Sequence, residues 1–380
     1  MLKSFHFLVL TMGLLLFSCE GDKIQPSPTT LNPEQQLQKK VQQFEAELER
    51  ELAEMETEGA IGLRSQIVLP AGSIDGLAAA IEEAGPGGTV LLESGPHVET
   101  GTVNIDHRIR LIGEDNATLI FDSAPLEVAG NIEVGLHFLD ANRSVVRNID
   151  FRVAGAVGGT AILLQNSHRT MVTRSSMEDF QFGVLIERSD RVFITHNDIA
   201  VSDLWQVGAP IVQSFGIVAI NGRDARVYAN RLSGGVTGIW ACDKNGYIAR
   251  NEFFGNLQGI ILCRVPAEYN YRLPDGYLLA ADLSCTNWAV FLNESHDNLD
   301  YGYQVIDGAN NNFLLANTAR DNLSGAYEFA GDTERFGLGI TPTSFENTAL
   351  IFSNDAYLDC GADNIIIGGS ALDNTSGNCF

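Results

Sequence analysis

A glycine-led repeat in the middle of the chain is the feature that most limits its fold. Four short apolar runs open with glycine, and successive glycines lie 33, 22 and 21 residues apart, at Gly183, Gly216, Gly238 and Gly259. A turn asparagine follows the first three at a nearly constant interval, as Asn197, Asn230 and Asn251. Glycine, strand, turn, second strand and asparagine every 21–24 residues are typical of a solenoid. The spacing therefore predicts one elongated body with stacked strands.

The repeat extends over most of the chain, from about Thr89 to Ile367. Because side chains alternate along a strand, the first and third residues after each glycine should fill the core. The second residue should point outward, which gives an apolar row of Leu185, Val218, Trp240 and Ile261. Such a row is unusual on a solvated sheet, so we expect either loops or a ligand to cover it.

The N-terminus carries an export pattern. Residues 1–18 have Lys3 before an apolar run that is too short to span a membrane, as in a signal peptide. The ending Leu16-Phe17-Ser18-Cys19 resembles the bacterial lipobox, which implies lipidation of Cys19. The alternative is an ordinary cleaved signal with a spare cysteine. The lipidated form predicts a protein anchored to the bacterial cell envelope, at the outer membrane or facing the periplasm.

Two helices should precede the strands. Residues 19–33 are polar and proline-containing, which predicts a flexible tether. Residues 34–59 carry an apolar stripe at helical spacing, which predicts a stalk helix that either rests on the body or self-associates. Residues 65–380 then form the solenoid, and a short helix from Ser73 to Ala84 should cover its open end. Ser73 can cap that helix, Ile74 should share its buried face, and Gly85 should end it.

The segment from Ser73 to Glu114, SIDGLAAAIEEAGPGGTVLLESGPHVETGTVNIDHRIRLIGE, resembles the opening of right-handed parallel β-helix proteins of the pectin-lyase-like superfamily. The glycine-led turns resemble the repeats of that superfamily as well. The resemblance implies an all-β fold, a right-handed parallel β-helix, over about 300 residues. It implies little about activity, since the superfamily contains lyases, hydrolases, epimerases, phage tailspikes and accessory proteins.

The catalytic signatures of those enzymes are missing from this sequence. The polygalacturonase strings N-T-D, D-D, G-H-G and R-I-K do not occur, nor does the epimerase string D-P-H-D. The lyase motif R-x-P-x-x-R begins at Arg264 but has Tyr269 in place of the second arginine. Only the scaffold is therefore carried over by the resemblance.

Two insertions border the strands with the outward apolar row, and together they predict a groove. They span Val201–Ser214 and Val265–Asn287, and they supply aromatic and charged residues suited to sugar rings. The predicted substrate-binding residues are Trp205, Trp240, Tyr269, Tyr271 and Arg272. Asp243, Lys244 and Arg264 are the candidate catalytic group at its floor. The competing interpretation is a surface charge ladder of Asp243 and Arg264.

The histidine spacing gives no support to a transition-metal site. The candidate calcium ligands lie on turns rich in Asp and Asn, and they are Asp297, Asp300, Asp307 and Asp321. Cys242 and Cys263 occupy matching positions of adjacent turns, so we expect a disulfide between them. Cys360 and Cys379 should form a second disulfide. Cys285 is then unpaired, unless it forms a disulfide with Cys263 in place of Cys242.

The net charge of −24 argues against nucleic acid as a partner and disfavours anionic polysaccharides unless a cation bridges the charges. Two functions remain open. One is an enzyme that cuts or epimerises a polysaccharide in the groove, and the other is a noncatalytic β-helix that binds a surface glycan or acts as a periplasmic accessory protein. The sequence does not indicate the oligomeric state.

Overall fold

The computed structural model describes isolated residues between 39 and 54 and the ranges 65–122, 133–155, 158–202, 214–262, 285–331, 333–334, 340–341 and 343–372. The chain divides into two units, Met1–Glu58 and Gly59–Phe380. The described residues of the first unit are helical. Most of residues 34–59 fall outside the description, as do the signal peptide and tether, so the stalk helix and Cys19 lipidation stay predictions. In the part of the chain that the structure describes, no helix is long and apolar enough to cross a membrane.

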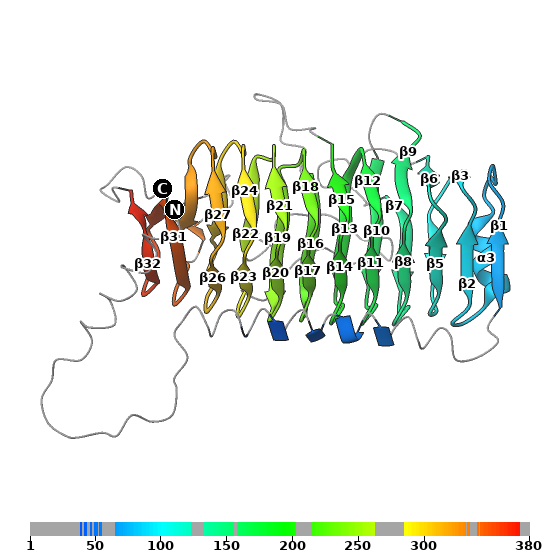
Figure 1. Cartoon of the computed structure of the whole chain (residues 1–380), viewed down its shortest axis with the longest axis horizontal. Coiled ribbons are helices and arrows are strands. Elements are labelled where there is room, and N and C mark those ends of the chain that lie inside the picture. Colours follow the sequence, from blue (N-terminus) through cyan, green and yellow to red (C-terminus); the bar gives the residue numbers. More distant parts are fainter. Residues whose placement is uncertain are drawn as a thin grey trace, which may run out of the picture. The chain divides into compact units, whose positions relative to one another are not determined.

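The second unit is a parallel β-helix, in which each coil contributes strands to three columns (Figure 1). We call these columns the first, second and third sheets, in the order in which the chain passes through one coil. Neighbouring strands of successive described coils are parallel, and most pairs keep one register along their length, for example Val227 beside Ile248. The predicted stack of parallel strands is thus confirmed.

The first sheet contains β4 (Val103–Ile105), β7 (Val134–Leu139), β10 (Gly158–Gln165), β13 (Phe180–Glu187), β16 (Phe215–Arg223), β19 (Thr237–Lys244), β22 (Gln258–Leu262), β25 (Tyr301–Val305) and β28 (Gly325–Phe329). The second contains β1 (Gln66–Leu69), β2 (Thr89–Leu92), β5 (Arg110–Gly113), β8 (Val145–Arg147), β11 (Met171–Thr173), β14 (Phe193–Thr195), β17 (Arg226–Tyr228), β20 (Tyr247–Ala249), β23 (Ala289–Phe291) and β26 (Phe313–Leu315). The third contains β3 (Gly95–Glu99), β6 (Ala117–Phe121), β9 (Asp150–Val153), β12 (Ser176–Glu178), β15 (Asp198–Ala200), β18 (Arg231–Ser233), β21 (Glu252–Phe254), β24 (Glu294–His296) and β27 (Thr318–Arg320).

The C-terminal coils differ from this pattern. β31 (Thr348–Asp359) pairs with β26 through its start and with β28 through its end, so one long strand serves two columns. β32 (Ile365–Ala371) lies beside β31. A short antiparallel pair, β29 (Thr333–Glu334) with β30 (Ile340–Thr341), stands apart from the coils.

The glycines repeat because neighbouring coils approach too closely for a side chain. A Cβ on Gly216 would lie 2.6 Å from the carbonyl oxygen of Gly238, and one on Gly238 would lie 2.7 Å from that of Gly259. Real Cβ atoms do not come so near. The spacing that reveals the solenoid in the sequence is therefore a packing requirement of the stacked coils.

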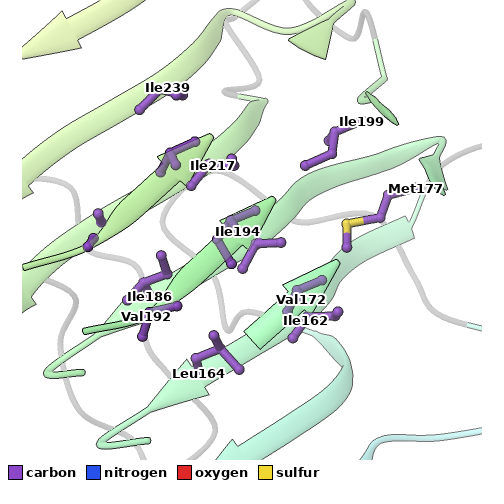
Figure 2. Packing of buried hydrophobic residues seen from close by; sticks show 14 of the residues in the cluster. Ile162, Leu164, Val172, Met177, Ile186, Val192, Ile194, Ile199, Ile217 and Ile239 are labelled. Atoms are coloured by element: carbon purple, nitrogen blue, oxygen red, sulfur yellow. The ribbon is translucent and has the colours of Figure 1, made fainter. Parts of the chain in front are cut away.

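Aliphatic side chains fill the interior in columns, as predicted. In the first sheet Ile162, Val184, Ile217 and Ile239 form one column, and Leu164 and Ile186 belong to the next. Figure 2 shows the isoleucines of both columns together with Val172 and Ile194 of the second sheet. All of them are completely buried. At roughly 25 cal/mol per Å² of apolar surface, this continuous core supplies most of the driving force for folding.

Buried asparagines line the turn between the second and third sheets. The Oδ1 atom of Asn230 accepts from the backbone N–H of Asn197 at 2.9 Å, and Asn251 does the same for Asn230. The ladder continues through Asn293 to Asn317. The residue before each asparagine has a positive φ, for example 54° at Ala229 and at Arg250, which turns the chain sharply. The predicted asparagine column is confirmed and is longer than its sequence signal.

Helix α3 (Leu77–Ala84) packs on β1, β2 and β4 at the N-terminal end of the coils, where Leu77 and Ile81 are buried. Gly85 ends it with φ 65°, as predicted. The predicted capping by Ser73 and the predicted burial of Ile74 were both wrong, because the helix begins after the loop that contains these two residues. Glu99 accepts the Leu77 N–H at 2.9 Å in place of Ser73, whose hydroxyl instead contacts His97 Nδ1. Ile74 is 69% exposed.

Candidate functional site

The outer face of the first sheet is the candidate site, because the longest intervals between strands in the sequence directly precede or follow strands of this sheet. β6 ends at Phe121 and β7 begins at Val134, β15 ends at Ala200 and β16 begins at Phe215, and β22 ends at Leu262 before β23 at Ala289. The second and third sheets are joined by short turns over most of the described coils. Variable segments beside one face of a rigid scaffold are where binding residues usually lie.

The middle of this face is the predicted apolar row. Leu185, Val218, Trp240 and Ile261 form a cluster separate from the core, so they do point outward. Their side chains are buried nonetheless, and Trp240 is only 4% exposed. Phe215 stacks between Phe182 and Trp240, with ring centroids 5.4 and 4.8 Å apart. Trp240 therefore presents no open ring face to a sugar in this structure, and its role in binding stays a prediction.

Asp243 lies elsewhere than predicted. It follows the outward Cys242, so the alternation of the strand turns it inward, and it is completely buried. Both of its carboxylate oxygens are buried without a hydrogen-bond partner. Burial, reinforced by the charges of Asp190 and Asp224, raises its pKa well above the ordinary value. The predicted surface ladder and the acid–base cluster at a groove floor both needed an accessible Asp243, and both placements were wrong.

The prediction was wrong because it did not continue the alternation of the strand to the fifth residue after Gly238. A β-bulge in the neighbouring β16 lies opposite this residue and breaks the matching of positions counted from the glycines. Ile220 pairs with Cys242 and Arg223 pairs with Lys244, so that two residues of β16 oppose Asp243 alone. Lys244 is half-buried at the end of β19. Arg264, Trp205, Tyr269, Tyr271 and Arg272 lie outside the described residues, so their predicted roles remain predictions.

The cysteine predictions had mixed outcomes. Cys242 and Cys285 are buried thiols outside any disulfide, so the expected Cys242–Cys263 bond is wrong, and so is the alternative with Cys285. The described register between β19 and β22 ends at Ala241 and Leu262, before the two cysteines would face each other. Cys360 is disulfide-bonded, as predicted. Cys379 lies outside the described residues.

The C-terminal part of the face carries a chain of amides and carboxylates, which we call the polar row: Thr237, Gln258, Asp300, Gln304 and Glu328. The Thr237 hydroxyl donates to Gln258 Oε1 at 3.2 Å, and Gln258 Nε2 donates to Asp300 Oδ2 at 3.2 Å. Gln304 Nε2 donates to the same Asp300 oxygen at 3.4 Å and to Glu328 Oε2 at 2.5 Å. The row thus crosses β19, β22, β25 and β28 on one hydrogen-bonded path.

Within the polar row Asp300 is half-buried, while Gln304 is only 1% exposed. Both amide contacts of Asp300 reach its Oδ2 atom, and no described residue donates to its Oδ1 atom. Gln304 Oε1 is a buried acceptor with no hydrogen-bond partner. The sequence analysis considered Asp300 only as a calcium candidate and missed the two glutamines, because no spacing motif joins positions 258, 300, 304 and 328.

A second polar group lies at the N-terminal part of the same face. His137 Nε2 contacts Gln165 Oε1 at 2.8 Å, and its Nδ1 lies 3.2 Å from Asn104 Oδ1. On the next coil Arg188 Nε donates to Glu187 Oε2 at 2.7 Å. His137 is 4% exposed, which places it under the surface. We therefore assign these side chains to the support of the face.

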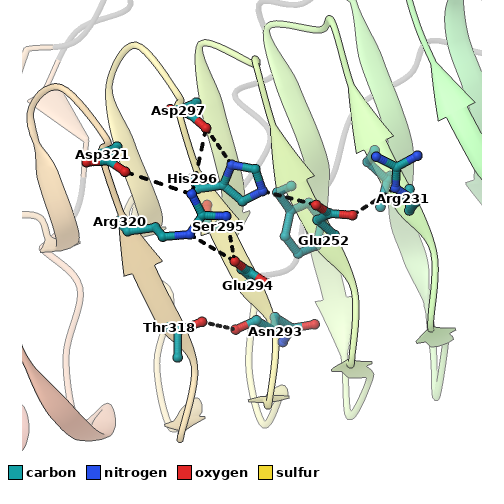
Figure 3. Close-up of polar contacts among 12 residues, drawn as sticks. Arg231, Glu252, Asn293, Glu294, Ser295, His296, Asp297, Thr318, Arg320 and Asp321 are labelled. Atoms are coloured by element: carbon teal, nitrogen blue, oxygen red, sulfur yellow. Dashed lines mark hydrogen bonds and ion pairs between the residues drawn. The ribbon is translucent and has the colours of Figure 1, made fainter.

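The outer face of the third sheet carries an ion-pair network, shown in Figure 3. Glu252 accepts from Arg231 Nε at 2.8 Å and lies 3.1 Å from His296 Nε2, and Arg231 holds the pKa of Glu252 below its ordinary value. His296 Nδ1 also lies 2.7 Å from Asp297, and Arg320 donates to Glu294. Exposed pairs of this kind contribute about 0–1 kcal/mol each. These charges satisfy one another across coils, so the network stabilises the sheet.

The described residues contain no group of three or more His, Cys, Asp or Glu side chains arranged to hold a metal ion. Of the calcium candidates, Asp297 and Asp321 contact Arg320, and Asp300 belongs to the polar row. Calcium binding stays untested.

Comparison with known proteins identifies the scaffold. A family model described as a right handed beta helix region matches residues 134–266. The chain contains a right-handed β-helix region. None of the curated proteins compared with this sequence matches it.

Several solved structures are similar to this chain at low identity. One is the A-module of mannuronan C-5 epimerase AlgE4 from Azotobacter vinelandii, with 14% identity, coverage of 80% of this chain and 95% of that chain, and a TM-score of 0.49. Another is pectate lyase Pel9A, with 11% identity, coverage of 83% and 80%, and a TM-score of 0.48. A third is the catalytic domain of a GH87 alpha-1,3-glucanase in complex with nigerose, with 11% identity, coverage of 83% and 69%, and a TM-score of 0.43. At these identities the likeness concerns the fold and assigns no residue role to this chain.

Proposed function

We propose that this protein binds a saccharide chain on the outer face of the first sheet, over the polar row. The observation that carries the proposal is Asp300, whose Oδ2 is held by two glutamine amides while no described residue donates to its Oδ1. A carboxylate held in this way is a preorganised acceptor for sugar hydroxyls. The stacked strands beneath it form a rigid and extended surface, which suits an extended ligand.

We further propose, from the lipobox-like ending at Cys19, that the protein is a lipoprotein of the bacterial cell envelope. A glycan-binding body would then be tethered where surface polysaccharides are found. Mass spectrometry of the mature N-terminus tests this part. A diacylated Cys19 supports it, and an unmodified N-terminus at another residue rejects it.

Replacing Asp300 with asparagine tests the binding site. The substitution keeps the shape but removes the charge, and hydrogen bonds to charged groups are worth about 1.5–3 kcal/mol. Each 1.4 kcal/mol of binding free energy changes Kd tenfold. We therefore expect the variant to bind a saccharide that the wild type binds with an affinity lower by roughly tenfold to a hundredfold. Isothermal titration calorimetry measures it, with Asp297→Asn on the third sheet as the matched control. Equal affinities for wild type and Asp300→Asn would reject this site.

A second function, hydrolysis of the bound chain, is favoured by the position of Glu328. Asp300 and Glu328 both contact Gln304 Nε2, at 3.4 and 2.5 Å, so their contacting oxygens are at most about 6 Å apart. Retaining glycosidases use carboxyl groups roughly 5–5.5 Å apart. Product analysis after long incubation with bound oligosaccharides decides the matter. Shorter products that disappear in Glu328→Gln indicate hydrolysis, and intact oligosaccharides indicate a noncatalytic binding protein.

A further inference from the structure

We infer that the polar row selects neutral saccharide chains and rejects chains rich in uronic acids. The inference rests on the proposed saccharide binding and adds the chemical class of the ligand. It comes from the distribution of charge and of hydrogen-bond acceptors around Asp300.

The row offers acceptors to a ligand. Gln258 Nε2 donates to Asp300 Oδ2. Gln304 Nε2 donates to the same oxygen and to Glu328 Oε2. Asp300 Oδ1 and Gln304 Oε1 are acceptors to which no described residue donates. Sugar hydroxyls are donors and match them, whereas the carboxylate of a uronic acid has no hydrogen to donate when ionised.

Three of the four described strands beneath the row carry no basic residue. The sequences of β22, β25 and β28 are QGIIL, YGYQV and GAYEF, which contain no lysine or arginine. The fourth strand, β19, ends in the half-buried Lys244, at the opposite end of the strand from Thr237 of the row. The described arginines at the ends of first-sheet strands lie several coils away and are bound to acids, Arg188 to Glu187 and Arg223 to Asp190. A uronate placed over Asp300 would therefore meet a like charge.

The repulsion acts at two ranges. Close to Asp300 it is local and weakly screened, because the carboxylate is half-buried. Farther away the net charge of −24 repels a polyanion, but salt screens this field over about 10 Å at 0.1 M. Selection against uronates should thus weaken with added salt and still persist, since like charges at close approach suppress the wrong partner.

The test uses the mature full chain and linear hexasaccharides of matched length. Cellohexaose, mannohexaose and xylohexaose represent neutral chains, and hexagalacturonate and hexamannuronate represent uronates. Calorimetric titrations are done at 0.15 and 0.5 M salt with a chelator, so that no divalent cation bridges the charges. We expect at least one neutral hexasaccharide to bind ten times more tightly than either uronate at both salt concentrations.

Glu328→Gln provides the second arm, because it removes one charge from the row while the amide keeps the shape. The affinity for uronates should rise at least threefold in this variant, and Asp297→Asn on the third sheet should leave it unchanged. Circular dichroism confirms that both variants are folded. Uronates that bind as tightly as the neutral chains would overturn the inference and leave the proposed binding intact. Titrations in which no hexasaccharide binds would overturn both.

Discussion

Replacing Asn251 with alanine is expected to lower the free energy of unfolding by about 3–5 kcal/mol. Its Oδ1 accepts from the backbone N–H and the side-chain amide of Asn230, each at 2.9 Å. Its Nδ2 donates to the carbonyl oxygen of Val227 and to Asn293, each at 3.0 Å. Alanine would leave these groups buried without partners, and each such group costs about 1–3 kcal/mol.

Urea denaturation followed by far-ultraviolet circular dichroism measures this loss. Asn142→Ala is the control, since Asn142 is an exposed asparagine outside the ladder, and we expect a change of less than about 1 kcal/mol for it. A loss of similar size in both variants would contradict the structural role of the ladder.

Replacing Asp243 with asparagine is expected to stabilise the protein increasingly as pH rises above about 4. Burial without a hydrogen-bond partner raises the pKa of Asp243 in the folded state, so this carboxyl stays protonated where that of the unfolded chain has ionised. The unfolded state then binds fewer protons, and the wild type loses stability with increasing pH up to the folded-state pKa. Asparagine does not titrate and removes that loss.

The difference in unfolding free energy between Asp243→Asn and wild type should therefore grow by up to about 1.4 kcal/mol per pH unit. Denaturation at a series of pH values from 4 to 8 measures it, with the exposed Asp115→Asn as control. A difference that is flat with pH, or that shrinks, would show that Asp243 is ionised in the folded protein.

The coil structure could be predicted because its two requirements are each met by one residue type at a fixed interval. Only glycine fits at Gly216, where the next coil's carbonyl occupies the space of a side chain. Asparagine is suited to position 230 because its side-chain amide accepts from Asn197 on one neighbouring coil and donates to Asn251 on the other. Both signals recur with the period of the fold, so the sequence displays them directly.

The candidate site could not be predicted in the same way, because its residues share no period. Gln258, Gln304 and Glu328 come from three different coils, separated by unequal numbers of residues, and they are brought together only by the stacking of β22, β25 and β28. Counting positions from the glycines also failed past the bulge in β16, which separates the register of Asn221 from that of Asp243. The same counting placed Cys242 beside Cys263, although the described pairing of their strands ends one residue earlier.

The most direct test of this account is a crystal structure of the protein with the neutral hexasaccharide that binds it most tightly. The account predicts a sugar ring over the polar row, with a ring hydroxyl within about 3 Å of Asp300 Oδ1. A saccharide bound on another face of the β-helix, or one that makes no contact with Asp300, would contradict it.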